Sequence, residues 1–156
     1  MKNILFEEKV PAMAVLPILL GFSVLMLLAV VIAPFFGYLQ KIGPESQITL
    51  AILLLLDILV LIAFNKLKII LTEEDFVFGF WFFRKKVALA MIDRVEVGEY
   101  SFKNYYGYGI RMGRDRSWGY VPRSGKGVKV FLKDRSIYFV SSGRAEELAE
   151  KIKSKI

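Results

Sequence analysis

The sequence contains no cysteine and no histidine among its 156 residues. Without cysteine there is no disulfide, no thiolate nucleophile and no thiolate metal site, and without histidine there is no imidazole general base. The glycine-rich segment 124–127 lacks the spacing of a phosphate-binding loop and has no helix after it. No paired catalytic groups stand out elsewhere. We therefore predict a non-enzymatic protein with no cofactor and no metal.

Charge is absent over a long stretch near the amino terminus. No residue from Pro11 to Gln40 is charged, and a second apolar run, Ile48 to Phe64, has Asp57 as its single charge. About 20 apolar residues in a helix cross the hydrocarbon core of a bilayer. Backbone polar groups cannot stay unpaired in lipid, so each run is expected to form a helix. We predict a transmembrane helical hairpin with spans at about 12–36 and 48–64.

The first apolar run is too long for the core of a cleaved signal peptide, so we expect it to stay in the protein. Lys2 and Lys9 precede it, Lys66 and Lys68 follow the second run, and Lys41 alone lies in the intervening turn, residues 37–47. Positive residues concentrate on the cytoplasmic side of membrane spans. This bias predicts a multi-pass protein of the cell (plasma) membrane with both termini in the cytoplasm.

The remaining residues, 65–156, form one basic domain after the hairpin domain, residues 1–64. They include 19 basic and 11 acidic residues, a net charge of +8. Short runs rich in β-branched and aromatic residues indicate strands. The expected strands cover residues 69–72, 76–83, 87–97, 110–113, 118–121, 128–132 and 136–140. Between them we expect turns at 73–75 and 84–86, and a long loop or irregular strand around 100–109.

The chain ends in a predicted helix that begins after Ser142-Gly143. Ala145, Leu148, Ile152 and Ile156 fall on one stripe, as the core-facing side of an amphipathic helix requires. Acidic residues lie in its first turns and lysines in its last, which suits the helix dipole. About seven strands and this helix predict a partly open antiparallel β-barrel closed by a C-terminal helix. The whole chain is thus expected to be a membrane α-helical hairpin plus an α+β domain.

The domain after the hairpin resembles the pleckstrin-homology-like (PH-like) domains of small bacterial membrane proteins. The resemblance covers about 90 residues and is found in segments 90–95, 108–111, 118–121, 127–130 and 145–149. It implies the PH-like fold and the layout of two spans followed by one such domain. The first strand-to-strand loop, which is basic in lipid-binding members, is Glu73-Glu74-Asp75 here, and acidic side chains repel phosphate.

Two candidate sites follow from residue types. Asp57 is costly inside a membrane, so it is a candidate proton relay or protomer contact. The alternative is a neutral Asp57, hydrogen bonded to a backbone carbonyl or to a polar group such as Ser23 or Thr49. The second candidate is a patch of aromatic and basic residues that would contact lipid headgroups or stack against the bases of single-stranded nucleic acid. Its residues are Tyr105, Tyr106, Tyr108, Arg111, Arg114, Arg116, Trp118, Tyr120, Arg123 and Lys126.

The alternative for the patch is that its aromatic side chains fill the core while its charges keep the domain soluble. Taken together, the sequence predicts a scaffold that presents a PH-like domain at the cytoplasmic membrane face. Its expected partners are membrane lipids, including anionic headgroups, and another membrane protein or a second copy. Two alternatives stay open: a transporter or channel subunit that uses Asp57, and a membrane-tethered nucleic-acid binder, for which nucleic acid is the less expected partner.

Overall fold

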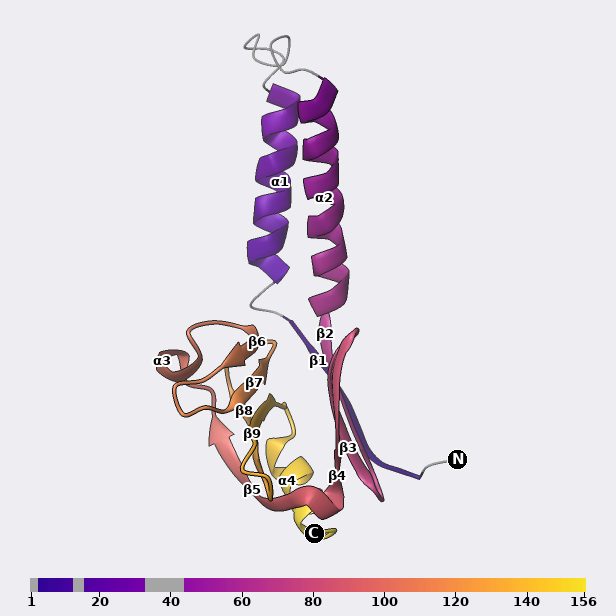
Figure 1. Ribbon diagram of the computed structural model, residues 1–156, viewed down its shortest axis with the longest axis vertical. Coiled ribbons are helices and arrows are strands. Elements are labelled where there is room, and N and C mark those ends of the chain that lie inside the picture. The colour runs from indigo at the N-terminus through magenta and orange to yellow at the C-terminus, as the bar shows by residue number, and fades with distance from the viewer. Residues whose placement is uncertain (1–2, 13–15, 33–43) are drawn as a thin grey trace. The chain divides into compact units, whose positions relative to one another are not determined.

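A computed structural model describes residues 3–12, 16–32 and 44–156 (Figure 1). The chain divides into two compact units. A helical unit covers residues 16–63, and an α+β unit combines residues 1–15 with residues 64–156. The sequence placed residues 1–15 with the hairpin instead. Most of the predicted turn, residues 37–43, lies outside the described residues.

The helical unit consists of α1 (Leu16–Ile32) and α2 (Pro44–Phe64), which run side by side (Figure 1). Helices therefore occupy both apolar runs, although α1 begins later and α2 earlier than the predicted spans. Within the described residues, none of the helices has both the length and the apolar character needed to cross a membrane.

The first sheet of the α+β unit is an antiparallel meander in the order β1-β2-β3-β4. Its strands are β1 (Ile4–Pro11), β2 (Lys66–Thr72), β3 (Asp75–Phe80) and β4 (Phe83–Ala88). β1 pairs with β2 in a register that sets Val10 opposite Leu67, and both side chains are buried. The residues before the first apolar run, which the sequence analysis left without structure, are thus an edge strand.

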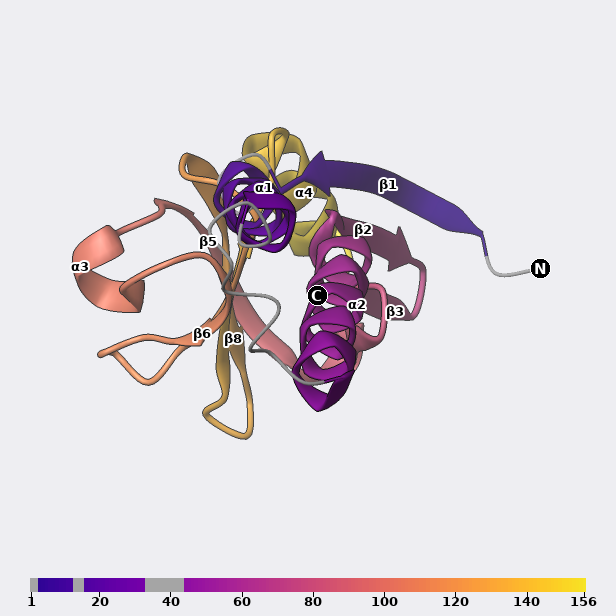
Figure 2. The same ribbon diagram turned by 90° about the horizontal axis from the view of Figure 1, so that it is seen from above.

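The second sheet has five strands in the order β5-β8-β9-β7-β6, and β7 runs parallel to β9. The strands are β5 (Ile92–Glu99), β6 (Gly109–Met112), β7 (Trp118–Val121), β8 (Lys126–Leu132) and β9 (Ile137–Ser141). A short 3₁₀ turn, η3 (Leu89–Met91), leads into β5, and a one-turn helix, α3 (Phe102–Tyr105), follows it. Seen from above, β1, β2 and β3 lie on one side of this unit and β5, β6 and β8 on the other (Figure 2).

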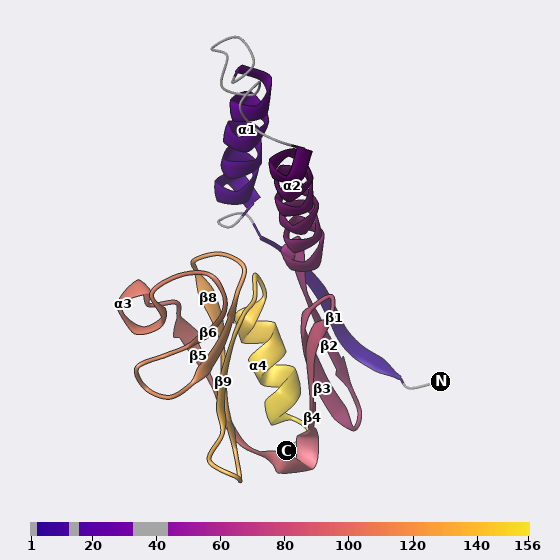
Figure 3. The ribbon, with the colours of Figure 1, turned by 45° about the horizontal axis from the view of Figure 1, so that its top comes forward.

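The terminal helix α4 (Ala145–Lys153) lies between the two sheets (Figure 3). Leu148 and Ile152 are fully buried, in one core with Phe76 and Phe78 of the first sheet and Val128 and Val130 of the second. A helix with one apolar stripe stabilises a sheet by covering its apolar face. The predicted stripe is confirmed for Ala145, Leu148 and Ile152. It is wrong for Ile156, which lies beyond the helix and is 48% exposed.

The α+β class is confirmed, but the details of the predicted barrel are not. Among the described residues the strands form two sheets and no closed barrel, and the second sheet is mixed rather than antiparallel. Eight of the nine described strands lie in residues 65–156, where about seven were predicted. Two local predictions were also wrong. Residues 84–86 belong to β4 rather than to a turn, and the segment expected to be a loop contains α3.

Candidate functional site

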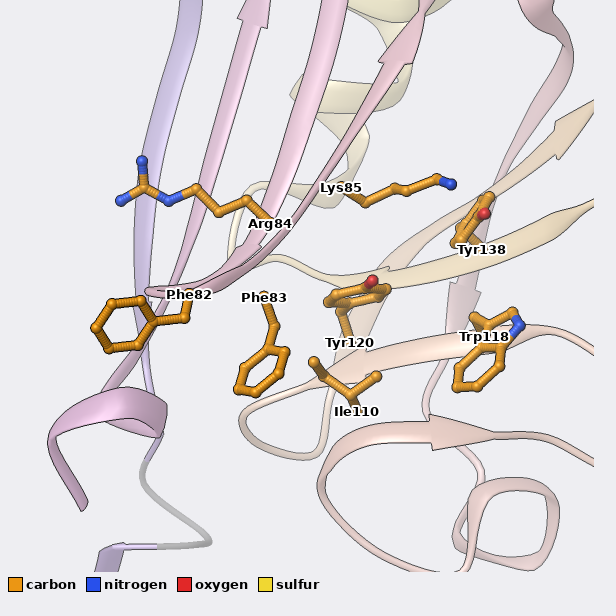
Figure 4. A pocket seen from close by; sticks show the side chains of 8 residues that line it. All are labelled: Phe82, Phe83, Arg84, Lys85, Ile110, Trp118, Tyr120 and Tyr138. Atoms are coloured by element: carbon orange, nitrogen blue, oxygen red, sulfur yellow. The ribbon is translucent and has the colours of Figure 1, made fainter. Parts of the chain in front are cut away.

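A groove opens between the turn that joins β3 to β4 and the face of the second sheet (Figure 4). Its volume is about 480 Å³. Aromatic side chains and two cations make up most of its lining, and the lining contains no carboxylate. The lining residues are Phe82, Phe83, Arg84, Lys85, Ile110, Trp118, Tyr120 and Tyr138.

Gly79 determines how the β3–β4 turn is built. Its φ is +147°, and a Cβ at this position would come within 2.2 Å of the carbonyl oxygen of Phe83. Only glycine adopts this conformation without strain and allows the two strands to approach so closely. The result is a tight turn at Trp81 and Phe82, whose rings stack with centroids 4.9 Å apart and are 54% and 74% exposed.

The ring of Phe64 packs against residues on both sides of this turn. Phe64 is the last residue of α2, and β2 begins two residues later. Its ring lies 5.1 Å from the ring of Phe80 and 5.8 Å from that of Phe83, centroid to centroid. The exposed aromatic turn therefore lies beside the junction of α2 and β2.

Two tyrosines form the inner wall of the groove. The rings of Tyr120 and Tyr138 lie 4.9 Å and 5.5 Å from the ring of Phe78, a fully buried residue of β3. Burial raises the pKa of Tyr120, and the neighbouring Tyr138 adds to this effect. Tyr120 consequently stays a neutral hydrogen-bond donor at physiological pH.

Lys85 crosses the groove from the β4 side. It is paired with Phe78 in the β3–β4 ladder, and its ammonium nitrogen lies 5.6 Å from the centre of the Tyr138 ring. Figure 4 shows Lys85 extending toward Tyr138, while Arg84 points the opposite way. Outside the groove, hydrogen bonds from Ser136 lower the pKa of Asp134, and the positive charge of Lys85 contributes to that shift.

The residues of the predicted patch are distributed over several environments. Tyr105 is buried and its hydroxyl lies 2.6 Å from Ser117 Oγ, so it belongs to the core. Burial also raises its pKa. Tyr108 stacks on Tyr100 with centroids 5.3 Å apart, and Tyr106 is exposed beneath the guanidinium of Arg114. Trp118 and Tyr120 are the two patch residues that line the groove.

The basic patch residues have separate neighbours. Arg111 donates a hydrogen bond to the Tyr108 carbonyl oxygen, and Lys126 forms a 2.6 Å ion pair with Glu146 of α4. Arg116 occupies the turn between β6 and β7 with a φ of +61°. Arg123 is partly buried at the end of β7. The aromatic residues of the predicted patch thus divide among the core, the groove and the exposed surface, whereas its cations are spread around the second sheet.

Asp115 organises the β6–β7 turn. Its carboxylate accepts hydrogen bonds from Ser117 Oγ at 2.6 Å, Asn104 Nδ2 at 3.0 Å and Lys129 Nζ at 2.6 Å. Burial alone would raise the pKa of Asp115, but these donors outweigh burial and hold its pKa well below the usual range. The arrangement ties α3 to the hairpin and to β8, which is a structural role.

In the helical unit, Ser23 of α1 donates a hydrogen bond to the carboxylate of Asp57 in α2. Ser23 was one of the two side chains expected to satisfy Asp57. The other, Thr49, instead donates to the Glu45 carbonyl oxygen of its own helix at 2.9 Å. The Ser23 hydroxyl also lies 2.9 Å from the Leu19 carbonyl oxygen. Asp57 therefore has a polar partner on the neighbouring helix.

The sequence analysis missed the main lining of the groove. Phe82 and Phe83 were assigned to a continuous strand, and Arg84 and Lys85 to a solvated turn. The signal was present, because a strand that is aromatic at both its buried and its exposed positions leaves large rings in solvent. Comparisons with protein-family models, curated proteins and solved structures find no match to this chain.

Proposed function

We propose that this protein is an integral membrane protein whose helical unit anchors a non-enzymatic interaction module at the cytoplasmic face. The carrying observation is the exposure of large apolar side chains on both helices. Ile18, Phe22, Leu27 and Leu28 are 48–68% exposed. At 100° per residue these four positions are spread around α1 rather than along one stripe.

The same holds for α2, where Ile52, Leu53, Leu55 and Ile58 are 42–58% exposed and are likewise spread around the helix. Water-soluble proteins rarely leave contiguous apolar surface of this extent uncovered, because each buried Å² of such surface gains about 25 cal/mol. Lipid covers all sides of a helix at once. A bilayer is therefore the environment that best fits these two surfaces.

The proposed orientation rests on the charges where the chain enters and leaves the α+β unit. Pro11 pairs with Lys66, and the Ala12 amide donates to the Asn65 carbonyl oxygen at 2.9 Å. Both connections to the helical unit thus leave from the same end of the β1–β2 ladder. Lys9 and Lys66 are exposed there, and lysines at span ends favour the cytoplasmic side.

We retain the PH-like resemblance as a hypothesis about the module. Two packed sheets and a C-terminal helix agree with it, while the parallel β7–β9 pair departs from an antiparallel barrel. The acidic loop has a structural role here, since Asp75 is buried, bonds Thr72 through its backbone and forms a 3.1 Å ion pair with Lys86. A ligand site is therefore better sought elsewhere on the unit.

Single-cysteine labelling tests the proposal, because the natural chain has no cysteine. In intact cells, a membrane-impermeant maleimide should label Glu45→Cys, near the predicted outer turn, and spare Ser154→Cys until the membrane is broken. The chain should also stay in the membrane pellet after alkaline carbonate washing. Labelling of Ser154→Cys in sealed cells would overturn the orientation, and release by carbonate would overturn the membrane anchoring.

A further inference from the structure

We propose that the groove bounded by Phe83, Lys85, Trp118 and Tyr138 binds the headgroup phosphate of an anionic phospholipid taken from the adjoining bilayer. This inference rests on the proposed membrane anchoring and assigns a ligand to a groove of which the predicted patch included only Trp118 and Tyr120.

The first feature that supports this ligand is the exposed turn at Trp81 and Phe82. Both rings are exposed and stacked on each other, and the residues on either side of them, Phe80 and Phe83, contact the ring of Phe64, where α2 ends. Tryptophan and other large aromatic residues are favoured at the level of lipid headgroups, where one side of the ring meets hydrocarbon and the other meets water. If α2 lies in the membrane, the chain itself brings this turn to the interface, and the groove mouth opens next to it.

The second supporting feature is the size and chemistry of the groove. Its volume of about 480 Å³ lies in the range of small-molecule sites. The ammonium group of Lys85 and the hydroxyl groups of Tyr120 and Tyr138 are donors, while Phe83, Ile110 and Trp118 supply apolar contact. The combination suits a phosphate ester with an apolar continuation, and a carboxylate-free lining leaves nothing in the groove to repel its charge.

The alternative to a lipid ligand is an extended peptide that pairs with the outer edge of β4. β4 is the last strand of its sheet, so its outer backbone groups are available for pairing. Arg84, Lys85 and Lys86 follow one another along this edge, and consecutive cations on an edge strand are a common device against strand addition. The same cations attract anionic headgroups. Charge therefore favours the lipid.

Both tryptophans of the chain, Trp81 and Trp118, lie at this place, so intrinsic fluorescence reports on it directly. The full chain is reconstituted into phosphatidylcholine vesicles with increasing phosphatidylglycerol. In a Trp81→Phe variant the Trp118 emission should shift and saturate with the anionic lipid. In a Trp118→Phe variant, brominated acyl chains should quench Trp81 whether or not anionic lipid is present.

Lys85→Gln should raise the phosphatidylglycerol fraction at half saturation about fivefold, the effect expected for one lysine at an anionic surface. The matched control is Lys153→Gln, an exposed lysine at the end of α4, which should leave the midpoint unchanged. Asp134→Asn should lower the midpoint, because it removes the negative charge nearest Lys85. An equal Trp118 response in neutral vesicles, or equal midpoints for Lys85→Gln and Lys153→Gln, would overturn the proposal.

Two further arms distinguish other ligands. Free glycerol phosphate that reproduces the Trp118 shift in neutral vesicles would assign the groove to a soluble phosphate ester, and an acidic peptide that does so would assign it to a protein partner. Either result rejects the lipid. Flotation of the same samples separates the two proposals: a chain that fails to float with vesicles rejects both, whereas a chain that floats without a Trp118 response rejects the groove ligand alone.

Discussion

The hydroxyl of Ser142 donates a hydrogen bond to the carboxylate of Glu8, which lies 134 positions earlier in the chain. The other oxygen of the same carboxylate accepts the Gly143 amide at 2.8 Å, and Ser142 Oγ in turn accepts the Arg144 amide. An acidic side chain of β1 thus accepts one hydroxyl and one backbone amide from the residues just before α4. These hydrogen bonds connect the first strand to the segment that leads into the last helix.

Glu8→Ala should therefore lower the free energy of unfolding by about 1–2 kcal/mol, the usual effect of losing hydrogen bonds to a charged side chain. Denaturant unfolding in mild detergent, followed by tryptophan fluorescence, measures this loss. Glu96→Ala is the matched control, because Glu96 forms an exposed pair with Arg94 and such pairs contribute little. Equal losses in the two variants would show that the Glu8 contact does not stabilise the fold.

The two isoleucines of the predicted C-terminal stripe should respond differently to truncation. Ile152 is fully buried between the sheets and Ile156 is 48% exposed. Ile152→Ala should destabilise the α+β unit by about 2–5 kcal/mol, because it leaves a cavity in a packed core. Ile156→Ala should change stability by less than about 0.5 kcal/mol. Thermal unfolding of the two variants tests this, and similar shifts would contradict the placement of α4.

The sequence predicted most readily those elements whose signal is local. The hairpin of β6 and β7 around residues 114–116 and the helix α4 both follow from short-range patterns, and both are found. The edge strand β1 was missed because its pairing partner, β2, is about 60 residues away in the sequence. The parallel contact between β7 and β9 is likewise set by sheet packing and has no local signature.

The candidate site was predictable only in part for a related reason. Residue type alone does not distinguish a core tyrosine from a surface one, so Tyr105 and Trp118 were grouped together although one is buried and the other lines the groove. Arg84 and Lys85 resembled a turn because three consecutive cations are rare inside strands. Their place on an edge strand explains the exception.

Asp115 gives a prediction with a defined pH dependence. Its pKa is lowered in the folded protein, so the ionised carboxylate stabilises the fold above its unfolded pKa of about 3.9. That contribution is lost as the pH falls through the folded pKa. Asp115→Asn should therefore cost about 1–2 kcal/mol near pH 7, a modest value because the side chain is partly exposed.

The difference between wild type and Asp115→Asn should shrink as the pH falls below about 4, because the unfolded wild-type chain then takes up a proton at Asp115 that the folded protein does not. Denaturant unfolding at several pH values, read from the fluorescence of nearby Trp118, follows this change. Asp93→Asn serves as the control, because the carboxylate of Asp93 is exposed to solvent. A difference that stays constant down to low pH would show that the effect of the substitution is steric rather than electrostatic.

Ser23 and Asp57 allow a structural role of the Asp57 carboxyl to be separated from a role in a transport pathway. If their hydrogen bond holds α1 against α2, a double-mutant cycle of Ser23→Ala and Asp57→Leu should give a coupling energy of about 0.6–1.7 kcal/mol, the range measured for hydrogen bonds between membrane helices. Unfolding by dodecyl sulfate from mild detergent, monitored by far-UV circular dichroism, supplies the four free energies. Thr49→Ala is the control, because the Thr49 hydroxyl bonds the Glu45 carbonyl oxygen of its own helix, and it should show no coupling to Ser23.

The same variants separate this role from that of a transport pathway. A structural Asp57 should tolerate Asp57→Asn, because an amide can still bond Ser23, and neither variant should alter ion flux in reconstituted vesicles. If Asp57 lines a transport pathway, Asp57→Asn should keep the helices together but abolish ion flux. Ser23→Ala should leave that flux intact. Stability and flux should change together only if the hydrogen bond is needed to shape a pathway. An Asp57→Asn variant that keeps its stability but loses flux would favour a transporter or channel subunit over a scaffold.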